Sequence, residues 1–442
     1  MSGSMVLLML FLTIGLILLL ILKLKLNPAV SLVLGALFMG ISCKISPNET
    51  IGVISAGFGG TMTGVGLSVG FGVMIGQLIA ETGGVQVIAN KMLSLVSKEK
   101  SDYALGLTGL AVSIPVFYDV GYVILMPLAR SMSKVAKTLP YFAGALVAGL
   151  GIAHTFIPPT PGPMTGSEIL GLNIGTTLLW GLIVAIPTFF LSLFVYEKFF
   201  LSRKNFWKPE VDEDKSFVEE TVANVEKTPG FLTSITPILL PVLLILLGTV
   251  TKAINGEVPE VIQFISNKNI ALLIGLIFIF FVSQGYIGKE ATEKAIGKAL
   301  GNSGVVLLIT GAGGALGNVL KTVGVGDILA SGIAKYSIPA ILFVWLTAAL
   351  LKFAQGSGTV AMITAASLIA PAASSLGVNP VLLALAAFSG TLMAAHVNDS
   401  GFWITAKIAG LTTSGGLKTY TLVCAIEAVI SLVFIYILSI FI

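Results

Sequence analysis

The sequence contains few charged residues. Asp, Glu, Lys and Arg make up only 10% of its 442 residues, whereas a soluble domain has about 25%. The two cysteines, Cys43 and Cys424, lie far apart in apolar surroundings and predict no disulfide framework. The two histidines, His154 and His396, are also widely separated, which makes them poor candidates for a shared metal site. The net charge of +4 is too small to indicate a nucleic-acid partner.

Apolar residues are abundant instead, at 55% of the chain, and the mean hydropathy is +0.99. Apolar runs of about 20 residues recur, and each can cross a bilayer as a helix. The clearest runs are 6–22, 28–43, 178–196, 235–250, 270–282 and 421–442. The first run is interpreted as a retained span, because Lys23 and Lys25 follow it. The composition therefore predicts an all-α polytopic membrane protein.

One hydrophilic segment, 198–230, divides the chain into 1–197 and 231–442. Its first residues are rich in lysine and arginine, which predicts a cytoplasmic linker. The flanking halves share landmarks at nearly one spacing. His154 and His396 are 242 residues apart, and the related glycines Gly76 and Gly317 are 241 residues apart. This spacing predicts a duplicated unit.

Each half is expected to contain five spans and one re-entrant hairpin. The expected spans of the first half are 5–22, 28–43, 62–82, 140–171 and 174–197, with a hairpin near 105–130. Those of the second half are 232–251, 270–288, 302–320, 380–411 and 418–441, with a hairpin near 345–373. An odd number of spans gives the halves opposite orientations, which predicts the inverted repeat of secondary transporters.

Two of these spans are predicted to be broken helices. Segment 140–171 contains IPPTPGP at 157–163, which no continuous helix tolerates. Its counterpart, 380–411, contains the polar stretch HVNDSGFW at 396–403. Non-helical backbone at membrane depth survives only where it lines a protein-enclosed, water-filled cavity. We therefore expect both breaks to meet the two hairpin tips at one site.

The predicted site suits a polar organic anion. Free N–H groups at the N-termini of broken helices attract anions, whereas both arginines, Arg130 and Arg203, are expected on loops. Many hydroxyl and amide groups also suit a polyhydroxylated ligand. The side chains expected to donate hydrogen bonds are Ser113, Thr160, Ser357, Thr359, Ser400, His154, His396 and Asn398. Either histidine could instead bond only to a neighbouring helix.

Several acidic residues fall within the predicted spans or hairpins, and three of them are considered as sites for a coupling proton. Asp119 and Asp399 lie at matched polar breaks and are predicted to carry a coupling proton, because ionisable groups inside a membrane are costly and usually functional. Either could instead cap a helix N-terminus. Glu427 is alone in the last span, where it either pairs with a neighbour or takes up a proton.

Several stretches resemble the gluconate permease family of bacterial symporters. They are FGVMIGQLIAETGGVQVIA, IPVFYDVGYVILMPL, GIAHTFIPPTPGP and HVNDSGFW. The resemblance implies uptake of gluconate or related sugar acids with protons, across the bacterial cytoplasmic membrane. It also implies an elevator mechanism, in which a transport domain slides against a dimeric scaffold. It places the transport site at Tyr118, Asp119, Gly121, His154, Thr160, Gly162, Gly356, Ser357, Gly358, Thr359, His396, Asn398, Asp399 and Ser400.

We therefore expect a transporter, not an enzyme, that uses a proton and no other cofactor to carry a small hydroxylated carboxylate. One alternative is a sodium-coupled carrier, or a carrier of D-serine or another organic acid, on the same fold. A second alternative is a metal enzyme that uses His154, His396 and the two aspartates. A third is a passive channel. The metal enzyme is disfavoured because the sequence has no HExxH motif.

Overall fold

The computed structural model describes residues 2–214, 227–328, 331, 339–393, 395–397 and 399–442. Helices make up 81% of the structure, and the described residues contain no β-strand. Eight of the described helical segments are long and apolar enough to cross a membrane. The prediction of an all-α polytopic membrane protein is confirmed.

The first half of the chain folds into nine α-helices that run from Gly3 to Val195. They are α1 (Gly3–Leu22), α2 (Pro28–Ser42), α3 (Pro47–Glu81), α4 (Gly84–Ser94), α5 (Ser101–Val112), α6 (Tyr118–Ser133), α7 (Leu139–Phe156), α8 (Pro161–Ile169) and α9 (Ile174–Val195). A π-helical turn, η2 (Tyr196–Leu201), continues α9, and the short α10 (Pro209–Asp212) follows.

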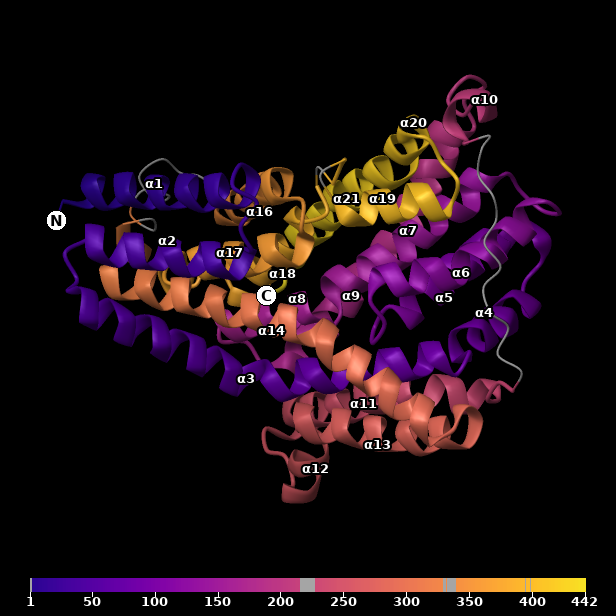
Figure 1. Cartoon of the computed structure of the whole chain (residues 1–442), viewed down its shortest axis with the longest axis horizontal. Coiled ribbons are helices and arrows are strands. Elements are labelled where there is room, and N and C mark those ends of the chain that lie inside the picture. The colour runs from indigo at the N-terminus through magenta and orange to yellow at the C-terminus, as the bar shows by residue number, and fades with distance from the viewer. Residues whose placement is uncertain (1, 215–226, 329–330, 332–338, 394, 398) are drawn as a thin grey trace.

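The second half begins after the linker, at Phe231. Its described helices are α11 (Phe231–Asn255), α12 (Glu260–Ile265), α13 (Lys268–Ile287), α14 (Lys289–Val323), α16 (Ala340–Gln355), α17 (Gly358–Ile369), α18 (Pro380–Gly390), α19 (Ser400–Ile408), α20 (Thr413–Gly416) and α21 (Leu422–Leu438), with a π-helical turn, η4 (Leu417–Thr421), before α21. In Figure 1, the long helices α3 and α14 run beside each other through the molecule.

The contacts of the two halves are reciprocal. Each limit of α14 lies 242 residues after the corresponding limit of α3. Helix α2 packs against α14, as its counterpart α13 packs against α3. Likewise α5 packs against α7 and α16 against α18, while α6 contacts α19 and α17 contacts α8. These described helices of the two halves therefore make matching contacts across the molecule.

Helices α3 and α14 are longer than the expected spans at 62–82 and 302–320. Each has 35 residues. Helix α3 begins early because the Ser46 hydroxyl accepts a hydrogen bond from the Glu49 N–H and Pro47 occupies the first turn. The polar first turns of α3 and α14 extend these helices beyond their apolar runs. Helix α2, expected as a span, has only 15 residues and is shorter than a typical transmembrane helix.

Both predicted helix breaks are present. Helix α7 ends at Phe156 and α8 begins at Pro161, so the IPPTPGP stretch interrupts the helix. Helix α18 ends at Gly390 and α19 begins at Ser400. The α7–α8 segment is the most enclosed of the eight long apolar segments, because α5, α6, α9, α18 and α21 all pack against α7. The break therefore lies in the interior of the protein.

The two predicted hairpins are also helical pairs with short tips. Helices α5 and α6 are joined by residues 113–117, and α16 and α17 by Gly356 and Ser357. Gly356 has φ of 77°, a left-handed conformation that glycine adopts without strain. The hairpin tips therefore bring the N-termini of α6 and α17 to the ends of tight turns.

Part of the expected linker is ordered against the last span. The Asp212 carboxylate is buried and pairs with the Lys418 ammonium at 2.7 Å. Burial raises the pKa of Asp212, but hydrogen bonds from Lys418, Ser414 and the Lys208 backbone N–H outweigh it and hold the pKa below its usual value. Residues 215–226 of the linker lie outside the described residues. Its described part is tied to the beginning of the α20–α21 segment.

Gly76→Ala is expected to destabilise the protein, because a Cβ at Gly76 would lie 2.0 Å from the Pro115 carbonyl oxygen in the α5–α6 tip. Forcing a methyl group into such a contact costs about 1–3 kcal/mol. The matched control is Gly60→Ala on the same helix, where a Cβ has no neighbour within 4 Å. This control should be neutral or slightly stabilising. Thermal unfolding in detergent measures both, and equal midpoints would contradict the proposed contact.

Candidate functional site

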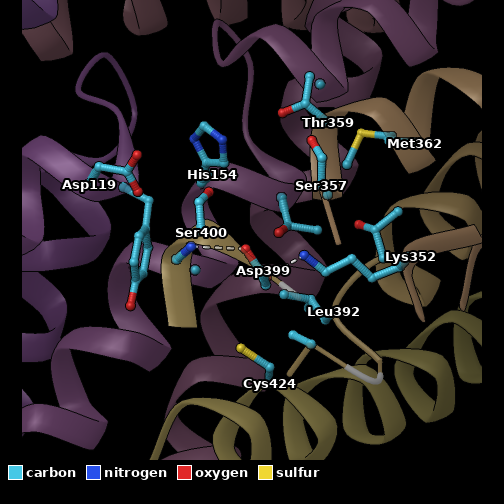
Figure 2. A pocket seen from close by; sticks show the side chains of 18 of the residues that line it. Asp119, His154, Lys352, Ser357, Thr359, Met362, Leu392, Asp399, Ser400 and Cys424 are labelled. Atoms are coloured by element: carbon cyan, nitrogen blue, oxygen red, sulfur yellow. Dashed lines mark hydrogen bonds and ion pairs between the residues drawn. The ribbon is translucent and has the colours of Figure 1, made fainter. Parts of the chain in front are cut away.

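A cavity of about 220 Å³ lies where the two breaks and the two hairpin tips meet (Figure 2). Its size suits a ligand smaller than the drug-sized molecules that fill pockets of about 300–1,000 Å³. Both halves of the chain contribute to its wall. The lining residues are Phe117, Tyr118, Asp119, Gly151, His154, Thr155, Gly162, Lys352, Ser357, Gly358, Thr359, Met362, Thr391, Leu392, Ala395, Asp399, Ser400, Gly401, Tyr420 and Cys424.

Four helices present their N-terminal turns to this cavity. Tyr118 and Asp119 begin α6, and Gly162 lies in the first turn of α8. The first residues of α17 and α19 complete the set, at Gly358 and Ser400. Helix N-termini carry partial positive charge and unpaired N–H groups, so their convergence favours a negatively charged ligand.

One buried ion pair crosses the cavity wall. Lys352, in the last turn of α16, pairs with the Asp399 carboxylate, and their side chains are 4% and 7% exposed. Figure 2 shows the Lys352 ammonium directed at Asp399. The ammonium also donates to the Gly356 carbonyl oxygen at 2.8 Å. The pair therefore joins the second hairpin tip to the second break.

The Asp399 carboxylate accepts two further hydrogen bonds. It caps α19 by accepting a hydrogen bond from the Gly401 N–H at 2.9 Å. It also accepts one from the Tyr420 hydroxyl at 2.8 Å. The Tyr420 ring packs edge-on against Tyr118, whose hydroxyl bonds with Thr405 at 2.6 Å. The capping role that the sequence offered as an alternative for Asp399 is therefore present, and its role in proton coupling stays a prediction.

Asp119 and His154 lie on the other side of the cavity from Lys352 (Figure 2). Asp119 is exposed and lies in the first turn of α6, where Phe117 and not Asp119 occupies the capping position. The His154 ring lies 6.1 Å from the Phe117 ring, and its Nδ1 is buried with no partner among the described residues.

Nine of the residues predicted for the site line the cavity. They are Tyr118, Asp119, His154, Gly162, Ser357, Gly358, Thr359, Asp399 and Ser400. Their roles in binding and coupling stay predictions, because no ligand is present.

Five other predicted residues, all described, do not line the cavity. Ser113 and Thr160 bond to the backbone carbonyls of nearby turns, and Gly121 abuts Leu150. The Gly356 carbonyl oxygen accepts a hydrogen bond from the Lys352 ammonium. The His396 ring packs 4.7 Å from the Phe353 ring. Asn398 lies outside the described residues.

Sequence reasoning missed Lys352 and Tyr420. Lys352 is the only charged residue in the apolar run 340–355, and that isolation inside a predicted hairpin was the available signal. Tyr420 had no such signal, because a tyrosine near a span end also suits the membrane interface. Among the described residues, no group of three or more His, Cys, Asp or Glu side chains could hold a metal ion.

Comparison with known proteins adds a family and a fold. Residues 5–441 match the family model described as GntP family permease. The high-affinity gluconate transporter of Escherichia coli is 34% identical over 422 residues, covering 93% of this chain and 94% of the relative. The Gnt-II system L-idonate transporter of Escherichia coli is 32% identical over 414 residues, covering 92% and 93%.

A solved structure supports the fold independently. The YdaH transporter of Alcanivorax borkumensis superposes with a TM-score of 0.59 at 16% identity, covering 89% of each chain. At that identity the likeness concerns the fold alone.

Removing one partner of the buried ion pair should destabilise the fold. Lys352→Gln leaves the Asp399 charge unpaired, and such a change costs about 3–5 kcal/mol. The double variant Lys352→Gln with Asp399→Asn removes both charges and should recover most of that loss. Thermal unfolding of the two single variants, the double variant and the wild type forms a double-mutant cycle. Additive effects would show that the two side chains do not interact.

Proposed function

Because the chain belongs to the GntP family of permeases, we propose that it imports gluconate or a related small hydroxylated carboxylate together with protons. The family assignment makes it a transporter and not an enzyme, and a multi-pass protein of the bacterial cytoplasmic membrane. The observation that supports an anionic substrate is the convergence of four helix N-termini on a cavity with one buried lysine.

The ends of a sugar acid match the two sides of the cavity. A carboxylate suits the Lys352 ammonium and the N-termini of α17 and α19. The hydroxyl chain suits the polar side chains across the cavity, Asp119 and His154. Two relatives are named as a gluconate transporter and an L-idonate transporter, and these names support a sugar acid as the cargo. D-serine or another organic acid is the alternative cargo on the same fold.

Charge balance favours proton coupling. With Asp119 and Asp399 ionised and Lys352 protonated, the cavity carries one excess negative charge. A bound carboxylate adds another, and uncompensated charge is costly inside a membrane. Protonation of Asp399 or Asp119 would offset this cost, and a proton on Asp399 would release Lys352 to pair with the substrate. Sodium bound near the broken helices is the alternative source of positive charge.

The proposed cycle is an elevator within an inverted repeat. The reciprocal contacts of the two halves, 1–197 and 231–442 around the linker 198–230, support the repeat. We propose that the hairpins and broken helices move as one unit, because they line the cavity together. Helices α1–α3, α11, α13 and α14 would form the stationary scaffold, and that scaffold would dimerise. In Figure 1, α11 and α13 lie together beside α3, away from the hairpin α16–α17.

Purified protein in liposomes tests the cargo and the coupling ion. A pH gradient, acidic outside and without sodium, should drive accumulation of labelled gluconate, and unlabelled L-idonate should compete. Collapse of the gradient with a protonophore should abolish accumulation. Accumulation driven only by a sodium gradient at equal pH would replace the proton by sodium. Uptake that never exceeds equilibration would favour a passive channel.

Asp399→Asn should reduce proton-driven uptake by about tenfold or more, because it removes hydrogen bonds to a charged group worth roughly 1.5–3 kcal/mol. The matched control is Asp327→Asn, the same change at an exposed position shortly after the end of α14. The control should transport at the wild-type rate. Initial rates of gluconate uptake at equal protein content measure both variants. An unchanged rate in Asp399→Asn would remove its assigned role.

A further inference from the structure

One buried carboxyl next to the cavity is not used by the proposed substrate site. Glu427, on α21, is 0% exposed. Neither of its carboxyl oxygens has a hydrogen-bond partner among the described residues. A carboxylate in this position would be a buried, unpaired charge, which is among the most costly groups in a protein interior. The neutral acid form removes most of that cost.

The position of Glu427 relative to the cavity is set by Gly151 and Cys424. Cys424 lines the cavity and lies three residues before Glu427, on the same face of α21. Gly151 of α7 also lines the cavity, and a Cβ built on it would lie 3.6 Å from the Glu427 Oε2. The carboxyl therefore lies directly behind a part of the wall that has no side chain.

The helices packed around Glu427 supply no counter-ion. Helices α9 and α18 contain no titratable residue, and α7 contributes only Tyr141 and His154. The turn η4 contributes Lys418 and Tyr420, of which Lys418 pairs with Asp212 and Tyr420 donates to Asp399. On α21 itself the neighbouring titratable group is Cys424. No cation among these groups is left to hold the carboxyl in its ionised form.

We propose that Glu427 is a proton-carrying site of the transport cycle, which exchanges its proton with water in the cavity past Gly151. This inference rests on the proposed proton-coupled function. The Asp399 carboxylate contacts the Lys352 ammonium, the Tyr420 hydroxyl and the Gly401 N–H. Glu427 has none of these contacts.

The proton balance of the step is simple. With the cavity open to the acidic side, the Glu427 carboxylate takes a proton from water and enters its neutral, low-cost form. With the cavity open to the opposite side, the acid returns the proton to water. No bond other than O–H changes, and no further reactant is needed. Release would require water from the cavity to reach the Glu427 carboxyl. The path is short at Gly151, because this residue has no side chain between the cavity and the carboxyl.

Glu427→Gln tests the proposal, because glutamine resembles the protonated acid in shape and cannot release a proton. Gluconate counterflow between equal concentrations, which needs no net proton movement, should be retained in proteoliposomes. Accumulation driven by the pH gradient should be lost. The matched control is Glu81→Gln, the same change at the partly exposed end of α3, which should keep both activities. Accumulation by Glu427→Gln at the wild-type level would overturn the proposal.

Gly151→Ala provides a second variant in case Glu427→Gln does not fold. Its added methyl group would lie at ordinary van der Waals distance from the carboxyl and so should be tolerated. It places an apolar group between Glu427 and the cavity, so proton-driven accumulation should fall by a larger factor than counterflow does, and the ratio of the two rates is the readout. Unchanged accumulation would contradict the proposed route. If wild-type accumulation itself does not respond to the pH gradient, proton coupling fails first and this inference fails with it.

Discussion

A helix that is interrupted inside an apolar layer leaves backbone N–H and C=O groups without partners, and the architecture of this protein follows from that constraint. Two helices are interrupted here, α7–α8 and α18–α19, and two hairpins end in tight tips. The protein places all four interruptions together and surrounds them with packed helix. The resulting cavity is where unpaired backbone groups are least costly, because water or a polar ligand can reach them.

The charges of the cavity depend on this placement. Lys352 is the single buried cation of the site, and it would be costly without Asp399. Asp399 in turn caps α19, so one carboxylate stabilises both the ammonium and the end of the interrupted helix. Tyr420 adds a third contact from the last span. The break between α18 and α19 therefore has two effects: it helps to form the cavity, and it supplies Asp399, which neutralises the charge of Lys352.

Two kinds of carboxyl lie at this site, and their surroundings suit different tasks. Asp399 is surrounded by hydrogen-bond donors. Glu427 lies behind Gly151 with no donor among the described residues, and is the proposed proton site. Asp119 is exposed and has fewer constraints. In the proposed cycle, the anion and the proton bind at separate places, which would be a physical basis for coupling their movement.

Amino-acid patterns by themselves determined the class of protein, both helix breaks, both hairpins and the spacing of the repeated landmarks. These features depend on local chemistry: apolar run length, the missing N–H of proline, and polar residues in an apolar context. Helix limits were less well determined, since the capped, polar first turns of α3 lengthened it beyond its apolar run. Only the tertiary structure shows that Lys352 pairs with Asp399, that the His396 ring packs against Phe353 and does not line the cavity, and that Glu427 lies behind Gly151. Those outcomes depend on how α7, α16 and α21 pack across large distances in the chain, which local spacing does not encode.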